Sequence, residues 1–238
     1  MPNNYFQFKQ FNIQQGKSSM KVCTDSCLFG AWVADKMERR FIEPKSILDI
    51  GTGTGLLSLM AAQKCDAKID AIEIDRDSYL QAKENFSASK WSPRLHIIDA
   101  DANMQIDDKK YDLIICNPPF YENDLKSSDK RKNIAKHHEA LTLEDLIAIV
   151  LKRLSENGGF TILLPSHRVE YFKQLAARNN FFVADELQVK QTPQHACFRG
   201  FLFFTMKKVP FIIQELIIKD KEGKYTAEFS YFLQDYYL

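Results

Sequence analysis

Between residues 45 and 180, short apolar runs alternate with stretches of helical composition. Each apolar run has the length of one buried strand, and the runs are 46–50, 69–74, 94–98, 111–116 and 160–165. The stretches of helical composition are 56–64, 78–89, 142–156 and 168–180. Strands that alternate with helices indicate a parallel sheet with helices on both of its faces. The sequence therefore predicts an α/β fold.

The C-terminal third of the chain departs from this alternation. The helix over 142–156 is expected to be stopped by the pair Gly158 and Gly159. Further on, 181–190 and 199–207 are two strand-like runs with no helix between them. They predict an antiparallel pair at or near one edge of the sheet. Together with the five earlier runs, this pair gives a mostly parallel sheet of seven strands.

A chain of 238 residues has the length of one large domain. Over 1–238 we expect a core at 45–207, an N-terminal covering segment at 1–44 and an appendage at 208–238 that holds a hairpin and a helix. Four side chains share one apolar face of that helix, which is expected to cap the domain: Phe229, Phe232, Leu233 and Tyr236.

Composition and short sequence patterns limit the compartment, the metal content and the partners that we expect of this protein. No apolar run approaches the length that spans a bilayer, and the first ten residues lack the pattern of a signal peptide, so we expect a cytoplasmic protein away from membranes. Cys23 and Cys27 lack the second cysteine or histidine pair of a zinc site, and we expect no metal. Because the net charge is only +1, any surface that binds nucleic acid must concentrate its basic residues locally.

The strongest local motif is the turn LDIGTGTG at 48–55, which follows a predicted strand and opens a predicted helix. The dinucleotide-binding fingerprint needs a glycine at the position of Leu56, and the lysine of a phosphate-binding P-loop is missing. Asp49 precedes the first glycine, so the ligand near this turn is expected to be cationic rather than a pyrophosphate. Three glycines permit positive φ and close approach of a ligand to the backbone: Gly51, Gly53 and Gly55.

Acidic side chains follow the next two predicted strands. Glu73 lies at the end of the second strand, where a carboxylate can accept hydrogen bonds from both hydroxyls of a ribose. After the third strand, Asp101 is the better placed of two carboxylates to accept from the amino group of an adenine, and Asp99 is the alternative.

The glycine turn and the two acids resemble the class I S-adenosylmethionine-dependent methyltransferases. The resemblance implies a Rossmann-like fold and S-adenosylmethionine as the cofactor. It places the glycine turn and Asp49 around the amino-acid part of the cofactor, Glu73 on its ribose and Asp101 on its adenine.

The fourth predicted strand is followed by Asn-Pro-Pro-Phe at 117–120. Pro118 and Pro119 fix φ and remove two backbone donors, while their carbonyls remain as acceptors. Asn117 adds a side-chain oxygen, and Phe120 offers a flat face on which a base can stack. Acceptors and an aromatic face, without a nucleophile, suit methyl transfer to an amino group whose lone pair is delocalised.

These four residues resemble the motif (Asn/Asp/Ser)-Pro-Pro-(Tyr/Phe/Trp) of methyltransferases that act on exocyclic amines. Such enzymes modify adenine N6, cytosine N4, guanine N2 or the amide of glutamine. The resemblance makes the four residues of the motif catalytic, and it makes Asn117 a contact of the cofactor as well.

Three longer stretches, 8–32, 117–146 and 225–238, resemble the bacterial family that methylates N6 of adenine 37 in a valine tRNA. The resemblance spans nearly the whole chain, although Cys23 and Ser26 stand where the family usually has glycine. It implies that tRNA is the substrate. We also expect a monomer. The same chemistry on ribosomal RNA is the alternative, and a catalytically silent RNA-binding protein that retains the fold is the rival hypothesis.

Positive charge is concentrated after the Asn-Pro-Pro-Phe motif. The resemblance places this segment against RNA phosphates near a flipped base, and a solvated surface is the alternative. Its basic residues are Lys126, Lys130, Arg131, Lys132, Lys136 and His137. Arg199, on an inferred edge strand, is a further possible RNA contact. Thr24 and Asp25 either form part of a lid over the cofactor or cap a helix.

Overall fold

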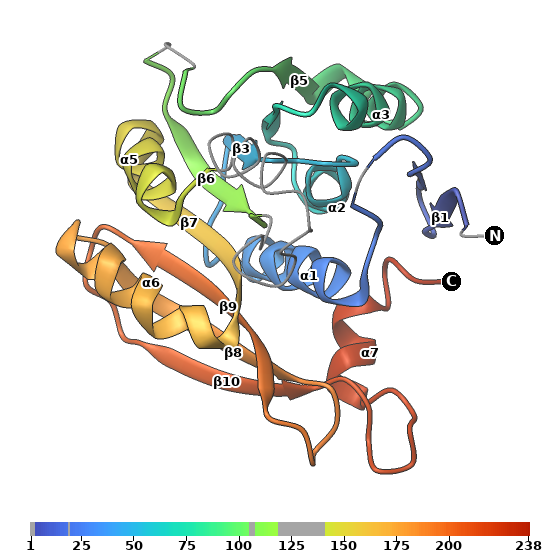
Figure 1. Cartoon of the computed structure of the whole chain (residues 1–238), viewed down its shortest axis with the longest axis vertical. Coiled ribbons are helices and arrows are strands. Elements are labelled where there is room, and N and C mark those ends of the chain that lie inside the picture. Colours follow the sequence, from blue (N-terminus) through green and yellow to red (C-terminus); the bar gives the residue numbers. More distant parts are fainter. Residues whose placement is uncertain (1–2, 19, 105–107, 119–140) are drawn as a thin grey trace, which may run out of the picture.

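The computed structural model describes residues 3–18, 20–104, 108–118 and 141–238. Within these ranges, the main sheet has eight strands in the order β10-β8-β9-β7-β6-β3-β4-β5 (Figure 1). A separate hairpin is formed by β1 (Tyr5–Gln7) and β2 (Asn12–Gln14). No helix among the described residues has the length and apolar character needed to cross a membrane.

Five neighbouring strands of the main sheet run parallel, as the alternating pattern predicts. They are β3 (Ser46–Ile50), β4 (Lys68–Glu73), β5 (Leu95–Asp99), β6 (Tyr111–Cys116) and β7 (Leu154–Pro165). The helices that follow β3, β4 and β7 are α2 (Leu56–Lys64), α3 (Arg76–Ser87) and α6 (Ser166–Arg178), and α5 (Leu143–Arg153) precedes β7. The predicted α/β class is thereby confirmed.

The other three strands continue the sheet beyond β7. They are β8 (Phe182–Lys190), β9 (Cys197–Thr205) and β10 (Ile212–Ile217). The predicted antiparallel pair is confirmed, because β9 lies between β7 and β8 and runs antiparallel to both. The sheet has eight strands rather than seven because β10, which the sequence placed in the appendage, pairs in parallel with β8.

The expectation that Gly158 and Gly159 stop a helix is wrong. Helix α5 ends at Arg153, the backbone of Leu154 is already extended, and both glycines lie inside β7. A Cβ atom on Gly159 would lie 2.3 Å from the ring of Phe203 on the neighbouring strand. These glycines therefore serve close packing of the sheet rather than termination of the helix.

Two apolar layers enclose the sheet. Helices α1 (Thr24–Glu38), α2, α3 and α7 (Ala227–Leu233) contribute to the layer on one face, and α5 and α6 form the other. Side chains of β9 alternate between the layers, with Phe201 and Phe203 in the first and Leu202 and Phe204 in the second. Of the predicted face of the last helix, Phe229 and Leu233 are buried in the first layer and Phe232 is half-buried. Tyr236 lies beyond the end of α7, where it is buried and donates to the backbone of Met60 on α2.

Candidate functional site

The chain order of the parallel strands reverses between β3 and β6. Connections from β3 lead through β4 to β5 on one side, and those from β6 lead to β7 on the other. Ligands of such sheets bind outside the carboxyl ends of the strands at this reversal. Ile50 pairs with Cys116, so Gly51 and Asn117 leave neighbouring strands side by side. The two strongest sequence motifs thus meet at one edge of the sheet.

The glycine turn has the backbone that its sequence predicts. Gly51, Gly53 and Gly55 have φ values of 68°, 58° and 83°, a region that other residues rarely adopt. A Cβ atom on Gly51 or Gly53 would meet nothing within 4 Å, whereas one on Gly55 would lie 2.5 Å from the ring of Phe86. The first two glycines therefore face open space that a ligand can approach, and the third permits packing against α3.

Asp49 is a buried carboxylate, and no cation of the described residues is paired with it. Its Oδ2 accepts hydrogen bonds from Thr52 Oγ1 at 2.6 Å and from Ser58 Oγ at 2.7 Å. Its Oδ1 is buried and has no partner among the described residues. Burial, together with the nearby charge of Glu73, raises the pKa of Asp49 to about 6, although the two hydroxyls oppose the shift. A positively charged ligand would supply a counter-charge for the Asp49 carboxylate.

Glu73 fastens the glycine turn to β4. One of its oxygens accepts from the backbone N–H of Gly53 at 2.8 Å, and the other accepts from the backbone N–H of Asp75 at 2.9 Å. Burial raises the pKa of Glu73, while these N–H groups oppose the rise. Each carboxylate oxygen can accept a second hydrogen bond, so the side chain can hold a ribose as well as the turn.

The neighbouring Ile74 was missed by the sequence reasoning. Its side chain is 53% exposed directly after Glu73, at the carboxyl end of β4. An exposed aliphatic side chain beside a carboxylate that is predicted to hold a ribose can pack against a base. The only sequence signal for Ile74 was its position directly after Glu73, the acid at the end of the predicted strand.

Asp99 and Asp101 both lie at the carboxyl end of β5. Asp99 is in register with Glu73 and forms an ion pair with Arg76 on α3. Asp101 accepts from the backbone N–H of Asn103 at 2.9 Å and so forms a turn. The choice of Asp101 over Asp99 for the adenine stays a prediction.

Asn117 follows β6 directly. Its Oδ1 is buried and has no hydrogen-bond partner among the described residues, and Pro118 beside it is buried. A buried acceptor without a donor costs about 1–3 kcal/mol, a cost that a donor on a ligand removes. Asn117 and Asp49 thus present unpaired oxygens from neighbouring strands. The predicted catalytic residues Pro119 and Phe120 lie outside the described residues.

The predicted RNA contacts Lys126, Lys130, Arg131, Lys132, Lys136 and His137 also lie outside the described residues. Arg199 is described, and its Nε donates to Asp25 Oδ2 at 2.7 Å. The expectation that Arg199 lies on an edge strand is wrong, because β9 lies inside the sheet between β7 and β8. Arg199 stands opposite Pro165 at the carboxyl end of β7, so the ion pair joins the start of α1 to the antiparallel strands. Cys23, rather than Thr24 or Asp25, is the N-cap of α1. No sequence signal joined residues so far apart in the chain.

The sequence model of the methyltransferase small domain family matches residues 20–184. A protein of Christiangramia forsetii named "tRNA1(Val) (adenine(37)-N6)-methyltransferase" is 40% identical, covering 100% of this chain and 99% of its own length. One of the same name from Flavobacterium johnsoniae is also 40% identical, covering 98% and 99%. The chain belongs to the methyltransferase small domain family.

Solved structures of methyltransferases share the fold. A protein described as a predicted O-methyltransferase from Agrobacterium tumefaciens superposes with a TM-score of 0.68 at 15% identity, covering 88% of this chain and 95% of its own. A ribosomal protein L11 methylase from Lactobacillus delbrueckii superposes with a TM-score of 0.58 at 20% identity, covering 82% and 84%. These likenesses confirm the predicted class I methyltransferase fold.

The residues of the site fit S-adenosylmethionine, the cofactor that the sequence motifs predict. Asp49 offers an unpaired buried oxygen for a cation, and Gly51 and Gly53 leave space against their backbone. Glu73 retains acceptor capacity for a ribose at the same sheet edge. Among the described residues, no three histidine, cysteine or acidic side chains are grouped as metal ligands.

Proposed function

We propose that this methyltransferase transfers a methyl group from S-adenosylmethionine to N6 of an adenine in tRNA, at position 37 of a valine tRNA. The observation that carries the proposal is the unpaired, buried Oδ1 of Asn117 beside the glycine turn, in a chain that is 40% identical over nearly its whole length to relatives named for that activity. A tRNA substrate places the enzyme in the cytoplasm, and we propose a monomer.

The proposed role of Asn117 is to orient the amino group that receives the methyl group. Its Oδ1 is placed to accept a hydrogen bond from the amino group of the target base, which favours the tetrahedral nitrogen whose lone pair is localised. The backbone carbonyl of Pro118 is a further acceptor, since a proline retains its carbonyl. Positioning of this kind can lower the activation barrier of a reaction between two molecules by roughly 7–11 kcal/mol.

The cofactor, when bound, supplies a methyl group on a positively charged sulfur, and the carbon–sulfur bond breaks as the new carbon–nitrogen bond forms. Asp49 and Glu73 keep that positive charge and its ribose at the carboxyl ends of β3 and β4. The methylated amino group then releases a proton to water, so no side chain of the site has to act as a strong base.

The test uses labelled S-adenosylmethionine and total tRNA from a strain that lacks the enzyme. We expect label in N6-methyladenosine, and mass spectrometry of nucleosides from each purified tRNA should locate it in a valine tRNA. Methylation of ribosomal RNA instead would move the substrate to the alternative class. Cofactor binding without methylation of any RNA would favour a catalytically silent RNA-binding protein and refute the proposal.

A further inference from the structure

A groove of about 330 Å³ runs along the edge of the sheet, between α3 and the edge strand β5. Leu95 and Ile97 of β5 give it an apolar floor, together with Phe86 of α3. Tyr79 and Lys83 of α3 stand over this floor. The groove is separate from the glycine turn, and the function proposed above does not use it.

The polar lining of the groove combines a cation, hydroxyl groups and an aromatic ring. Lys83 Nζ lies 5.9 Å from the centre of the Tyr79 ring, and the Arg76 guanidinium lies 5.0 Å from the same centre. Ser87 adds a hydroxyl donor, and none of the described lining residues is acidic. Phosphates, ribose hydroxyls and unpaired bases are the groups that such a lining recognises.

Lys83 brings a charge that no carboxylate of the described chain neutralises. The ion pairs of α3 are those of Arg76 with Asp99 and of Glu84 with Lys17. Lys83 is exposed on the same helix and takes part in neither. An uncompensated cation beside an aromatic ring is complementary to the phosphate backbone of a nucleic acid.

One wall of the groove, α3, is joined to the sheet edge that holds Glu73. Arg76 joins this wall to Asp99, and Asp99 is in register with Glu73 of the site. Three strand spacings separate β5 from β6, about 14 Å at roughly 4.8 Å each, which a few nucleotides of an RNA loop can span.

We propose that the groove between α3 and β5 binds a single-stranded part of the RNA substrate, next to the loop that carries the target adenine. Lys83 contacts a phosphate, and Tyr79 stacks on an unpaired base. The proposal rests on RNA being the substrate. It adds a second contact area, which holds the RNA while the target base reaches Asn117.

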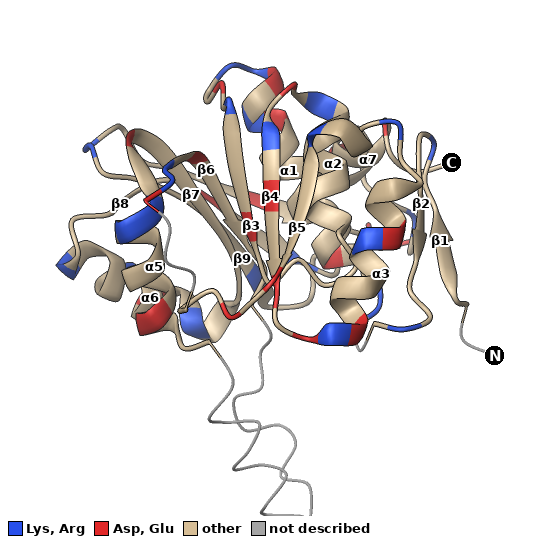
Figure 2. Ribbon diagram, turned by 90° about the horizontal axis from the view of Figure 1, so that it is seen from above, with Lys and Arg blue, Asp and Glu red and all other residues tan. Residues whose placement is uncertain are grey.

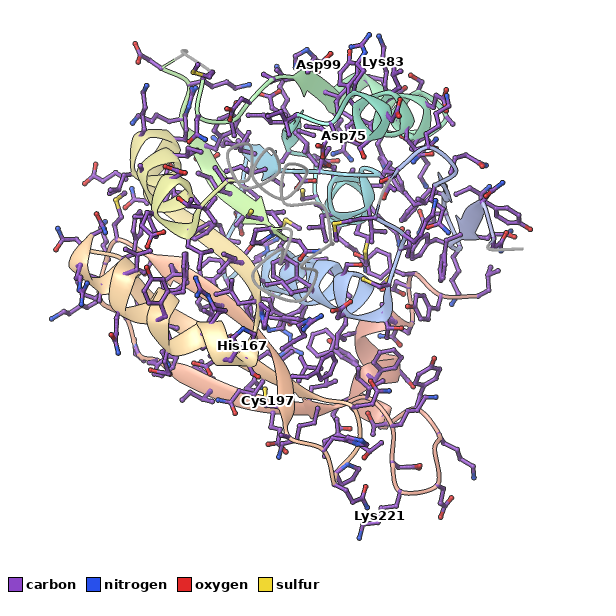
Figure 3. The ribbon with its side chains drawn as sticks, in the orientation of Figure 1. Asp75, Lys83, Asp99, His167, Cys197 and Lys221 are labelled. Carbon is purple, nitrogen blue, oxygen red and sulfur yellow. The ribbon has the colours of Figure 1, made fainter. Side chains whose placement is uncertain are left out.

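The test compares two charge reversals at exposed lysines. Lys83→Glu changes the groove, and Lys221→Glu changes a turn at the opposite end of the molecule (Figure 3). Affinity for unmodified valine tRNA is measured by filter binding over a range of salt concentrations, and affinity for S-adenosylmethionine by calorimetry. We expect Lys83→Glu to weaken tRNA binding about tenfold and to lower the salt slope by about one, with the cofactor affinity unchanged.

Tyr79→Ala serves as the second variant, because it removes the ring and leaves the charge of Lys83. We expect it to weaken tRNA binding about fivefold with an unchanged salt slope, as stacking is not a counterion effect. Equal tRNA affinities of Lys83→Glu, Lys221→Glu and wild type would overturn the groove proposal. A loss of cofactor affinity alone would also overturn it, because the groove would then belong to the cofactor site.

Binding and methylation are read separately, so the two proposals fail in different ways. Wild-type protein that binds tRNA without methylating it would refute the proposed function, while the binding of the variants would still decide the role of the groove. Wild-type protein that binds no RNA would overturn both.

Discussion

Buried carboxylates occur at the ligand edge of the parallel strands and on β8 of the antiparallel part, and the two places treat them differently. Asp49 and Glu73 accept only from hydroxyl and N–H groups of the described chain. Asp185 and Glu186 of β8 are each paired with a lysine, Asp185 with Lys36 and Glu186 with Lys173 at 2.9 Å. Figure 2 shows acidic positions within β4 as well as near the carboxyl ends of the parallel strands.

This comparison distinguishes buried carboxylates that are paired within the fold from buried carboxylates that are available to a ligand. The buried ion pair between α1 and β8 gives Asp185 a cation from the chain itself, although Asp185 Oδ1, like Asp49 Oδ1, has no hydrogen-bond partner among the described residues. A buried carboxylate without a cation is costly to keep ionised, and a cationic ligand reduces that cost. The same residue type therefore fixes the fold in one place and prepares a binding site in the other.

Removing the paired acid should give the largest effect on stability. Asp185→Ala leaves Lys36 buried without its partner, and we expect a loss of about 3–5 kcal/mol in the free energy of unfolding. Cofactor affinity of the folded fraction should not change. Urea denaturation measures the loss, and Glu215→Ala, which removes an exposed ion pair on the adjacent β10, should cost no more than about 1 kcal/mol. Equal losses in the two variants would contradict the distinction.

Removing the unpaired acceptor should affect turnover instead. Asn117→Ala is expected to lower the methylation rate about 10²–10³-fold, the range for loss of one oriented hydrogen-bonding group in an active site. The cofactor should still bind, as calorimetry can show, and the free energy of unfolding should not fall, because an unsatisfied buried oxygen is removed. Asn157→Ala, at an exposed position, is the control. Unchanged methylation by Asn117→Ala would refute its role.

The unpaired acid should make stability depend on pH. The pKa of Asp49 rises from 3.8 to about 6 on folding, a difference of about two units at 1.36 kcal/mol each, or about 3 kcal/mol. Because the folded pKa is the higher one, this contribution to stability is present below about pH 4 and is lost as the pH rises through about 6. Asp49→Asn should abolish it.

Unfolding of cofactor-free protein between pH 4 and pH 7 measures this difference. Cofactor affinity of the wild type should increase over the same interval, because ionised Asp49 attracts the sulfonium charge. A difference between wild type and Asp49→Asn that does not change with pH would contradict the assignment.

Two glycines with similar backbones should give the smallest effect. Gly55 and Gly223 have φ values of 83° and 82°, so alanine at either should cost about 1–2 kcal/mol of backbone strain. Only at Gly55 does the new Cβ also meet the ring of Phe86. We expect Gly55→Ala to be more destabilising than Gly223→Ala by about 1–3 kcal/mol in thermal or urea unfolding. Similar losses would show that Phe86 moves aside freely.

The sequence predicted most of the parallel part because its signals are local. Strands 46–50 and 111–116 were predicted with the bounds that the structure has, since each is an apolar run with a motif at its end. Asp49, Glu73 and the three glycines meet at one sheet edge for the same reason: the carboxyl ends of neighbouring parallel strands lie together.

The remainder depends on contacts between distant segments. A local rule predicted that Gly158 and Gly159 end a helix. In the structure Gly159 instead allows close packing against Phe203, a contact that the local rule does not contain. Asp25 with Arg199 and Lys36 with Asp185 are joined over 174 and 149 positions. No pattern within a short window contains such partners.

The position of β9 has a consequence for how the chain folds. Strands β3 to β6 are complete once residue 116 has been synthesised, whereas β7 and β8 are joined only through β9, which lies between them and is synthesised last of the three. Chains emerge from the ribosome at about 5–20 residues per second, so the parallel strands wait several seconds for the strand that joins the rest of the sheet. During that interval β7 exposes an unpaired edge, which makes a nascent chain without β9 prone to aggregation.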